Sequence, residues 1–157
     1  MEFKIQTKNI FKFKVIIIII SMFTPFLMLL YDNTIPSLSS DWRTSLQPLF
    51  IISNLLTCLM FITIPKWKLS GILLLTLTCF SIDYYSSFHN IVATLFFISN
   101  LYPLYSIKKY RILALVYFMG VLWYPSLIFF EIHGVVILCI YHLMVLISYN
   151  NIQNKRL

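Results

Sequence analysis

Six polar side chains with the chemistry to bind or react lie close to the ends of long apolar runs in this 157-residue chain. They are Ser37, Ser39, Asp83, His89, Glu131 and His133. Carboxylate and imidazole groups can transfer protons or coordinate zinc, and serine hydroxyls can hydrogen-bond a polar headgroup. Asp83 and His89 share the polar stretch 81–90, whereas Glu131 and His133 share a second short polar segment. These residues would form one polar cluster if both segments lie at the same end of the fold.

Three more polar residues, Asn54, Asn100 and His142, interrupt the apolar runs themselves. An ionisable side chain inside a membrane span costs about 2.5–3.5 kcal/mol on insertion scales, so it usually faces protein or water. His142 follows Glu131 by eleven residues, which would place it about 16 Å deeper on the same helix face. The two asparagines are interpreted as hydrogen-bonding residues between helices. The sequence thus predicts polar groups inside the membrane as well as at its outer surface.

Catalytic and cofactor-binding motifs are absent from the sequence. No two histidines have the i, i+4 spacing of a zinc-binding helix, and neither H-E-x-x-H nor G-x-S-x-G occurs. Only three glycines are present, and they form no phosphate-binding loop. We therefore assign no catalytic residue and expect no cofactor. Zinc enters only under an alternative in which His89 and His133 are its ligands.

The elements that must position these residues are apolar runs of membrane-spanning length. The chain is 60% hydrophobic and 11% charged, against about 25% charged for a soluble domain. Runs of about 17 apolar residues or more can cross a hydrocarbon core about 30 Å thick. The six expected spans are about 15–31, 46–65, 69–85, 91–107, 112–130 and 135–149. The sequence therefore predicts an all-α, polytopic membrane protein: a single transmembrane domain, 1–157, built as a six-transmembrane-helix bundle with an outer loop at 32–45.

Charges alternate along the chain from one side of the expected membrane to the other. If the N-terminus is cytoplasmic, 11 of the 12 basic residues lie on that side, and four of the five acids lie outside. This pattern follows the positive-inside rule and predicts that the N-terminus and the C-terminus are both cytoplasmic. Trp67, between Lys66 and Lys68, is expected at the membrane interface. Basic residues gathered in short turns, without a basic stripe, exclude a nucleic-acid-binding surface.

Two segments resemble signatures of a known family. Residues 35–39, Ile-Pro-Ser-Leu-Ser, follow the first apolar run. They resemble the P-x-I-S signature of the FRAG/DRAM/SFK family of six-span membrane proteins and look like its bacterial relatives of unknown function. Residues 88–97 are similar to the F-H…F-F opening of the fourth span in that family, and Glu131 resembles an acid in the last outer turn of some bacterial members. The resemblance implies a lipid-associated function, including lipid remodelling and membrane organisation.

The leading functional hypothesis is a lipid-associated or membrane-organising protein. In it the outer polar cluster holds the long loop over the bundle or binds a lipid headgroup, and Ser37 or Ser39 contacts His89. Membrane lipids are the expected partners, and a homo-oligomer or a partner membrane protein also fits this layout. Minimal loops and the lack of a glycosylation sequon favour a multi-pass location in a bacterial inner membrane.

Two alternatives belong to other functional classes. The first is a membrane-embedded, metal-dependent hydrolase acting on lipid, with the two histidines of the polar cluster as zinc ligands and one of its acids as a ligand or base. The second is a small transporter, in which Asn100 and His142 meet around a solvated cavity.

Overall fold

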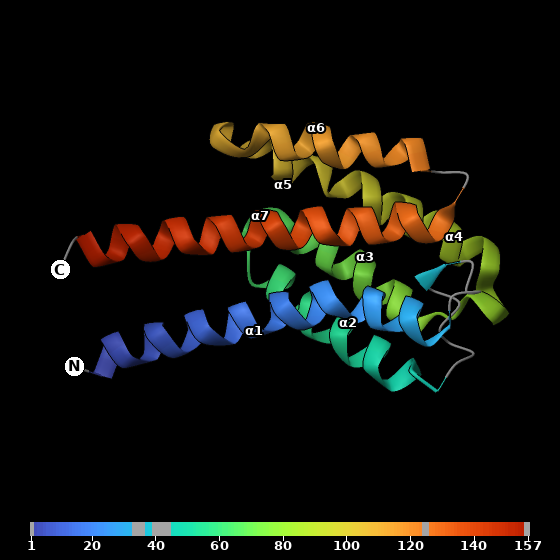
Figure 1. Ribbon diagram of the computed structural model, residues 1–157, viewed down its shortest axis with the longest axis horizontal. Coiled ribbons are helices and arrows are strands. Elements are labelled where there is room, and N and C mark those ends of the chain that lie inside the picture. Colours follow the sequence, from blue (N-terminus) through green and yellow to red (C-terminus); the bar gives the residue numbers. More distant parts are fainter. Residues whose placement is uncertain (1, 33–36, 39–44, 124–125, 156–157) are drawn as a thin grey trace.

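Helices make up most of the described fold (Figure 1). The computed structural model describes residues 2–32, 37–38, 45–123 and 126–155, and none of these residues lies in a strand. The α-helices are α1 (Glu2–Tyr31), α2 (Gln47–Ile62), α3 (Lys68–Cys79), α4 (Ile82–Ser99), α5 (Leu101–Ser106), α6 (Arg111–Met119) and α7 (Leu127–Lys155). Short 3-10 turns occur at Pro65–Trp67, Lys108–Tyr110 and Gly120–Trp123. The predicted all-α class is confirmed.

Two of the helices are long and apolar enough to cross a membrane. Ile10–Tyr31 in α1 reaches a mean hydropathy of 2.4, and Leu127–Asn151 in α7 reaches 2.1. Their 22 and 25 residues correspond to about 33 and about 37 Å of helix, more than the roughly 30 Å of a hydrocarbon core. A third crossing follows if Ile82–Ser106 and Lys108–Met119, which are bent by 119° relative to each other, form one broken span. The membrane character predicted from composition therefore has a structural basis among the described helices.

Consecutive helices pack side by side, and the first and last helices close the bundle (Figure 1). α1 packs against both α2 and α7, α2 packs against α3, and α3 packs against α4. Farther along the chain, α5 packs against α6 and α6 against α7. α4 makes few close backbone approaches to α6 or α7. In Figure 1 α1 leads away from the N-terminus and α7 returns toward it, so both terminal helices project from the same end.

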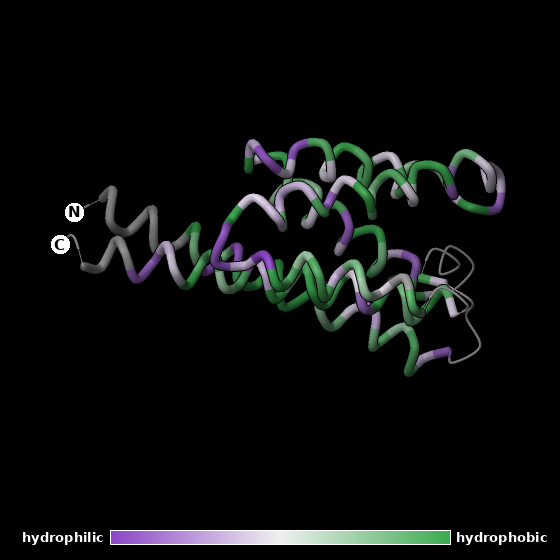
Figure 2. Tube along the Cα trace, turned by 90° about the horizontal axis from the view of Figure 1, so that it is seen from above, coloured by the Kyte–Doolittle hydropathy of each residue, from purple (hydrophilic) through white to green (hydrophobic). Residues whose placement is uncertain are grey.

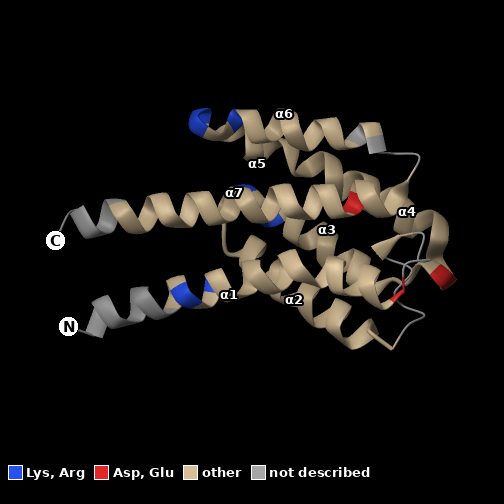
Figure 3. Ribbon diagram, in the orientation of Figure 1, with Lys and Arg blue, Asp and Glu red and all other residues tan. Residues whose placement is uncertain are grey.

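Charged residues separate toward the two ends of the bundle. In Figure 3 the blue Lys and Arg residues lie on α1, at the turn before α3 and at the start of α6, all toward the end from which the termini project. The red Asp and Glu residues lie toward the opposite end. Mostly apolar residues fill the length between them, and hydrophilic residues concentrate in the turns (Figure 2). We refer to these as the basic end and the acidic end.

The stretch 81–90 was expected to be a polar junction, but most of it is helix. The chain is extended only at Phe80 and Ser81, and α4 begins at the next residue. α4 carries a kink at Tyr85, where φ is −132° and ψ is 39°. The helix limits, at Cys79 and Ile82, therefore differ from the predicted span limits at residues 85 and 91. The end of an apolar run indicates where the surface of a helix becomes polar. It does not indicate where the helical backbone ends.

The segment from Glu131 to Gly134 was expected to be a turn, and it lies instead within α7, which starts at Leu127. The helix before it ends earlier than predicted, since α6 stops at Met119 and passes into a 3-10 turn. Gly134 is required by packing: a Cβ added there would lie 2.8 Å from Cε1 of Phe97. The glycine that suggested a turn therefore leaves room beside α7 for the Phe97 ring of α4.

The main core lies toward the basic end and is rich in aromatic side chains. Trp67 was expected at the membrane interface, but it is only 2% exposed. The 3-10 turn before α3 directs its indole inward, with ring centroids 4.9 Å from Phe61 and 5.5 Å from Tyr141. A smaller core at the acidic end joins Met28 to Leu38 and to the start of α7. This smaller core holds the described part of the outer loop against the bundle.

Candidate functional site

A cleft of about 440 Å³ lies between α4 on one side and α6 and α7 on the other, and is termed the α4–α6 cleft. Its walls are mainly apolar and include Phe97 and Phe130. The lining residues Ile98, Phe118 and Leu127 are 59%, 56% and 40% exposed, so the mouth faces the side of the bundle. The volume falls within the range of about 300–1,000 Å³ that is typical of small-molecule sites.

The imidazole of His89 lies at the polar part of this cleft. α4 contributes His89, Asn90 and Thr94 to the lining, three residues that fall within two helical turns. His89 is only 3% exposed, and its Nδ1 donates a hydrogen bond of 2.7 Å to the Phe80 carbonyl. The chain is extended at Phe80, so its carbonyl lies outside the regular hydrogen-bonding pattern of a helix. It accepts the N–H of the imidazole instead. In the neutral ring Nε2 is then a hydrogen-bond acceptor.

Glu131 reaches the same cleft from α7 and also holds the outer loop. Its Oε2 accepts a hydrogen bond of 2.5 Å from the backbone N–H of Leu38, across 93 residues of chain. Glu131 is 9% exposed, and Ser37 and Leu38 are buried beside it. A carboxylate that accepts a backbone N–H makes a short, strong hydrogen bond. One acid therefore connects the loop to the wall of the cleft.

The structure brings together part of the predicted polar cluster. His89 and Glu131 line one cleft, and Ser37 is next to the loop residue that Glu131 holds. Asp83 is exposed in the first turn of α4, and Ser39 lies outside the described residues. We expected Ser37 or Ser39 to contact His89. Among the described residues, Leu38 ties the loop to Glu131 of α7, and the His89 ring bonds the Phe80 carbonyl.

His133, the remaining member of that cluster, packs against α6. Its Nε2 donates a hydrogen bond of 2.8 Å to the Val116 carbonyl. α6 passes into a 3-10 turn at Gly120, four residues after Val116. The Gly120 N–H bonds the carbonyls of Tyr117 and Phe118 instead of the Val116 carbonyl, which accepts from the imidazole. A Cβ on Gly120 would lie 2.7 Å from Cδ2 of His133. His133 thus stabilises the end of α6.

Asn100 lies at the junction of α4 and α5 and is completely buried. Its Nδ2 donates to the Tyr117 hydroxyl at 3.2 Å, and that hydroxyl donates to the Phe97 carbonyl, also at 3.2 Å. The prediction that Asn100 hydrogen-bonds between helices thus matches its position between α4 and α6. Phe97 and Tyr117 also line the α4–α6 cleft, so this network stiffens its inner wall.

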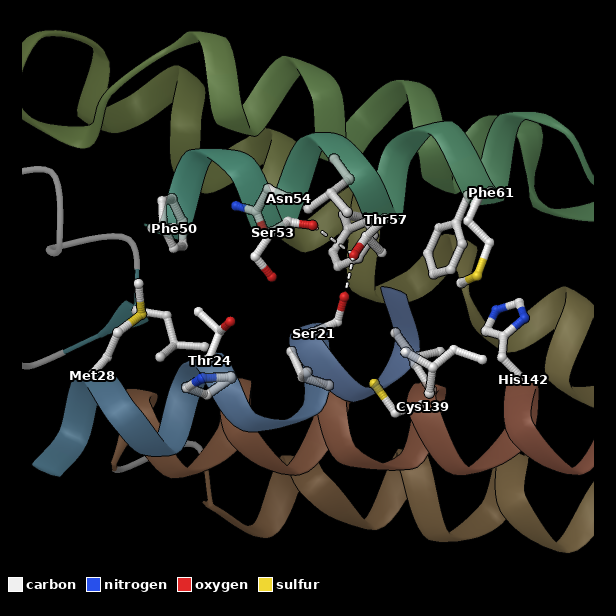
Figure 4. Close-up of a pocket in the computed structure, with 18 residues that line it drawn as sticks. Ser21, Thr24, Met28, Phe50, Ser53, Asn54, Thr57, Phe61, Cys139 and His142 are labelled. Atoms are coloured by element: carbon white, nitrogen blue, oxygen red, sulfur yellow. Dashed lines mark hydrogen bonds between the residues drawn. The ribbon is translucent and has the colours of Figure 1, made fainter. Parts of the chain in front are cut away.

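A second, smaller cavity of about 80 Å³ lies between α1, α2 and α7 (Figure 4). We term it the α1–α2–α7 cavity. Asn54 and His142 line it, whereas Asn100 lines neither of the two cavities. The His142 ring packs against both Phe61 and Trp67, with centroid distances of 4.9 and 4.4 Å. The transporter alternative requires Asn100 and His142 to line one cavity together. Neither of these two cavities is lined by both residues.

Sequence reasoning missed the hydroxyl groups of this second cavity. They belong to Ser21 and Thr24 of α1 and to Ser53 and Thr57 of α2. A signal was present, because these pairs are three and four residues apart within apolar runs and so share a helix face. The spacing indicates a polar stripe on each helix, but not that the two stripes face each other.

No group of three or more His, Cys, Asp or Glu side chains comes together as a set of metal ligands within the described parts of the chain. His89 and His133 each use one ring nitrogen on a backbone carbonyl. The three cysteines are free thiols, with Cys58 and Cys139 buried and Cys79 exposed. The hydrolase alternative thus has no assembled ligand set among these residues.

Comparison of the chain with protein-family models, with curated proteins and with solved structures gives no match.

Proposed function

We propose that this chain is a multi-pass protein of a bacterial inner membrane that binds a membrane lipid in the α4–α6 cleft. Six helical segments would cross the bilayer, with both termini in the cytoplasm. The separation of charge between the basic and acidic ends supports this orientation, because basic residues are retained on the cytoplasmic side. The acidic end, with His89 and Glu131, would then face outward.

Among the short helices, α2 fits one of the proposed crossings with the least mismatch. α2 has 16 residues, or about 24 Å, which is less than a hydrocarbon core of about 30 Å. The 3-10 turn at Pro65–Trp67 adds length at the basic end, and local thinning of the bilayer costs only fractions of a kcal/mol per Å of mismatch. Lys66 and Lys68 lie at the turn from α2 to α3, which supports a hairpin that returns from the cytoplasmic side.

The shape and chemistry of the cleft favour one amphiphilic molecule. Aromatic and aliphatic walls suit an acyl chain, and the exposed mouth residues would face the bilayer, from which a lipid enters sideways. His89, Asn90 and Glu131 provide a few polar groups where a headgroup would lie. The single observation that carries the proposal is the position of two buried titratable residues at a laterally open, apolar cleft.

The family resemblance points in the same direction. Residue 37, in the first segment that resembles the FRAG/DRAM/SFK signature, and His89, in the second, both lie at the acidic end. The lipid-associated function implied by that resemblance is therefore part of the proposal.

A photoreactive fatty acid with a diazirine on its chain tests the proposal in protein reconstituted into phospholipid nanodiscs. The Ala93→Trp substitution would fill the cleft, because Ala93 lines it from α4. Leu95→Trp is the matched control, since Leu95 lies on the same helix, is 48% exposed and is not a cleft residue. Adducts are mapped by mass spectrometry to the cleft residues Phe97 and Phe130, and thermal stability is recorded for each variant.

We expect adducts at these phenylalanines in the parent protein and a loss of at least about fivefold in Ala93→Trp. Leu95→Trp should keep the parental level. Equal labelling in the two variants would remove the proposal, because the adducts would then reflect general exposure to lipid.

A further inference from the structure

Three of the four hydroxyl groups of the α1–α2–α7 cavity, those of Ser21, Thr24 and Thr57, have used their protons within the protein. Thr57 donates to the Ser53 carbonyl at 2.9 Å, so the 2.6 Å contact between Ser21 and Thr57 must use the Ser21 proton. Thr24 donates to the Ile20 carbonyl at 2.7 Å. What Ser21 and Thr24 still offer to the cavity are oxygen lone pairs, which require a hydrogen-bond donor.

A buried imidazole nitrogen in the same cavity also lacks a partner. His142 lines the cavity near the main core and is 4% exposed, and its Nε2 has no hydrogen-bond partner in the described structure. The aromatic neighbours Phe61 and Trp67 pack against the ring, at interplanar angles of 28° and 53°, and neither hydrogen-bonds this nitrogen. Buried polar atoms of native proteins are usually paired, with ordered water where no protein group is available.

The cavity has the size and the charge that suit water. Its volume of about 80 Å³ is several times the roughly 10–15 Å³ that a single water requires. No Asp or Glu lines it, so a metal cation would be buried without an opposing charge. An apolar ligand would leave the hydroxyl lone pairs and the imidazole unsatisfied. Water is the small ligand that can donate to the oxygens and pair with either tautomer of His142.

We propose that the α1–α2–α7 cavity is a water-binding site that hydrates His142 in the interior of the bundle. The bound waters bridge the hydroxyls of α1 and α2 to the imidazole of α7. They form a polar core for the contact of α1 with its neighbours, separate from the α4–α6 cleft and independent of its ligand.

Radiolytic footprinting tests this site, because X-rays generate hydroxyl radicals from bound water where it sits. Cys139 and Cys58 form a matched pair within one protein: both are buried thiols, at 6% and 2% exposure, but only Cys139 lines the cavity. Met60 lines the cavity as well and is 6% exposed. The intact protein in nanodiscs is irradiated for milliseconds, and oxidation at each residue is quantified by mass spectrometry.

Cys139 should be oxidised at least about fivefold faster than Cys58, with Met60 also modified. The double substitution Ser21→Val and Thr57→Val would replace the hydroxyls by methyl groups, two at residue 21 and one at residue 57, and should bring the Cys139 rate down toward that of Cys58. Equal rates for the two thiols in the parent protein would overturn the proposal even if the double variant failed to fold. A Cys139 rate unchanged in a folded double variant would also overturn it.

Discussion

The hydrogen bond from Leu38 to Glu131 predicts how firmly the outer loop is held. Substitution Glu131→Ala would leave the buried Leu38 N–H without its acceptor. A hydrogen bond to a charged group contributes about 1.5–3 kcal/mol. At 1.36 kcal/mol for each factor of ten, local opening at Leu38 would become roughly 10- to 150-fold more frequent. Glu131→Gln keeps a neutral acceptor and should raise opening only about tenfold.

Hydrogen–deuterium exchange at the Leu38 amide measures this opening directly. Global thermal stability is a poorer readout, because removing a largely buried carboxylate also removes the cost of keeping its charge away from water. Amides of Ile137 to Tyr141 in α7 are the internal control and should keep their protection. Leu127→Ala, at a 40% exposed position in the first turn of α7, is the control variant.

The result that would refute this reasoning is unchanged exchange at Leu38 in Glu131→Ala. The loop would then be held by its apolar contacts with Met28 and the start of α7, and the carboxylate would be dispensable to it. An equal effect of Leu127→Ala would show instead that any change near the start of α7 releases the loop.

Three other predictions follow from the packing, the orientation and the site. Gly134→Ala should destabilise the protein by about 1–3 kcal/mol, because its Cβ would meet the Phe97 ring at 2.8 Å, and thermal unfolding should show no such loss for Met144→Ala at an exposed site of α7. Cysteines placed at Lys66 and Lys108 should both react with an impermeant maleimide only from the cytoplasmic side, and reaction from opposite sides would exclude the proposed topology. Purified protein should contain far less than one zinc per chain, whereas stoichiometric zinc that is lost in His89→Ala would favour the hydrolase alternative.

Acidic-end residues show why helix limits were harder to predict than helix content. The sequence changes from apolar to polar near residue 85, yet the backbone breaks at Phe80 and Ser81. The polarity of a residue indicates whether its side of a helix is exposed, not whether its backbone is helical. The first turns of α4 are helical and also exposed and polar. In the same way Glu131 and His133 looked like turn residues because they are polar, although each is satisfied inside α7 by a backbone group from elsewhere.

Trp67 and the hydroxyl pairs show the same limit inside the bundle. An indole between two lysines is typical of a membrane interface. The 3-10 turn rotates it instead into contact with Phe61 and His142. Ser21 and Thr57 each lie on a predictable stripe of one helix, but their 2.6 Å contact depends on how α1 is rotated against α2.

By itself the sequence determined the helical class, the membrane character and the alternation of charge, because these depend on composition and on the order of residues along one chain. Tertiary structure alone decided which polar groups meet: Glu131 with the Leu38 amide, His89 with the Phe80 carbonyl, and His142 with a cavity between three helices. The physical reason is that apolar helices of similar composition can be rotated and shifted against one another with little change in their local pattern. Contacts across 93 residues are set by the packing of all the helices together.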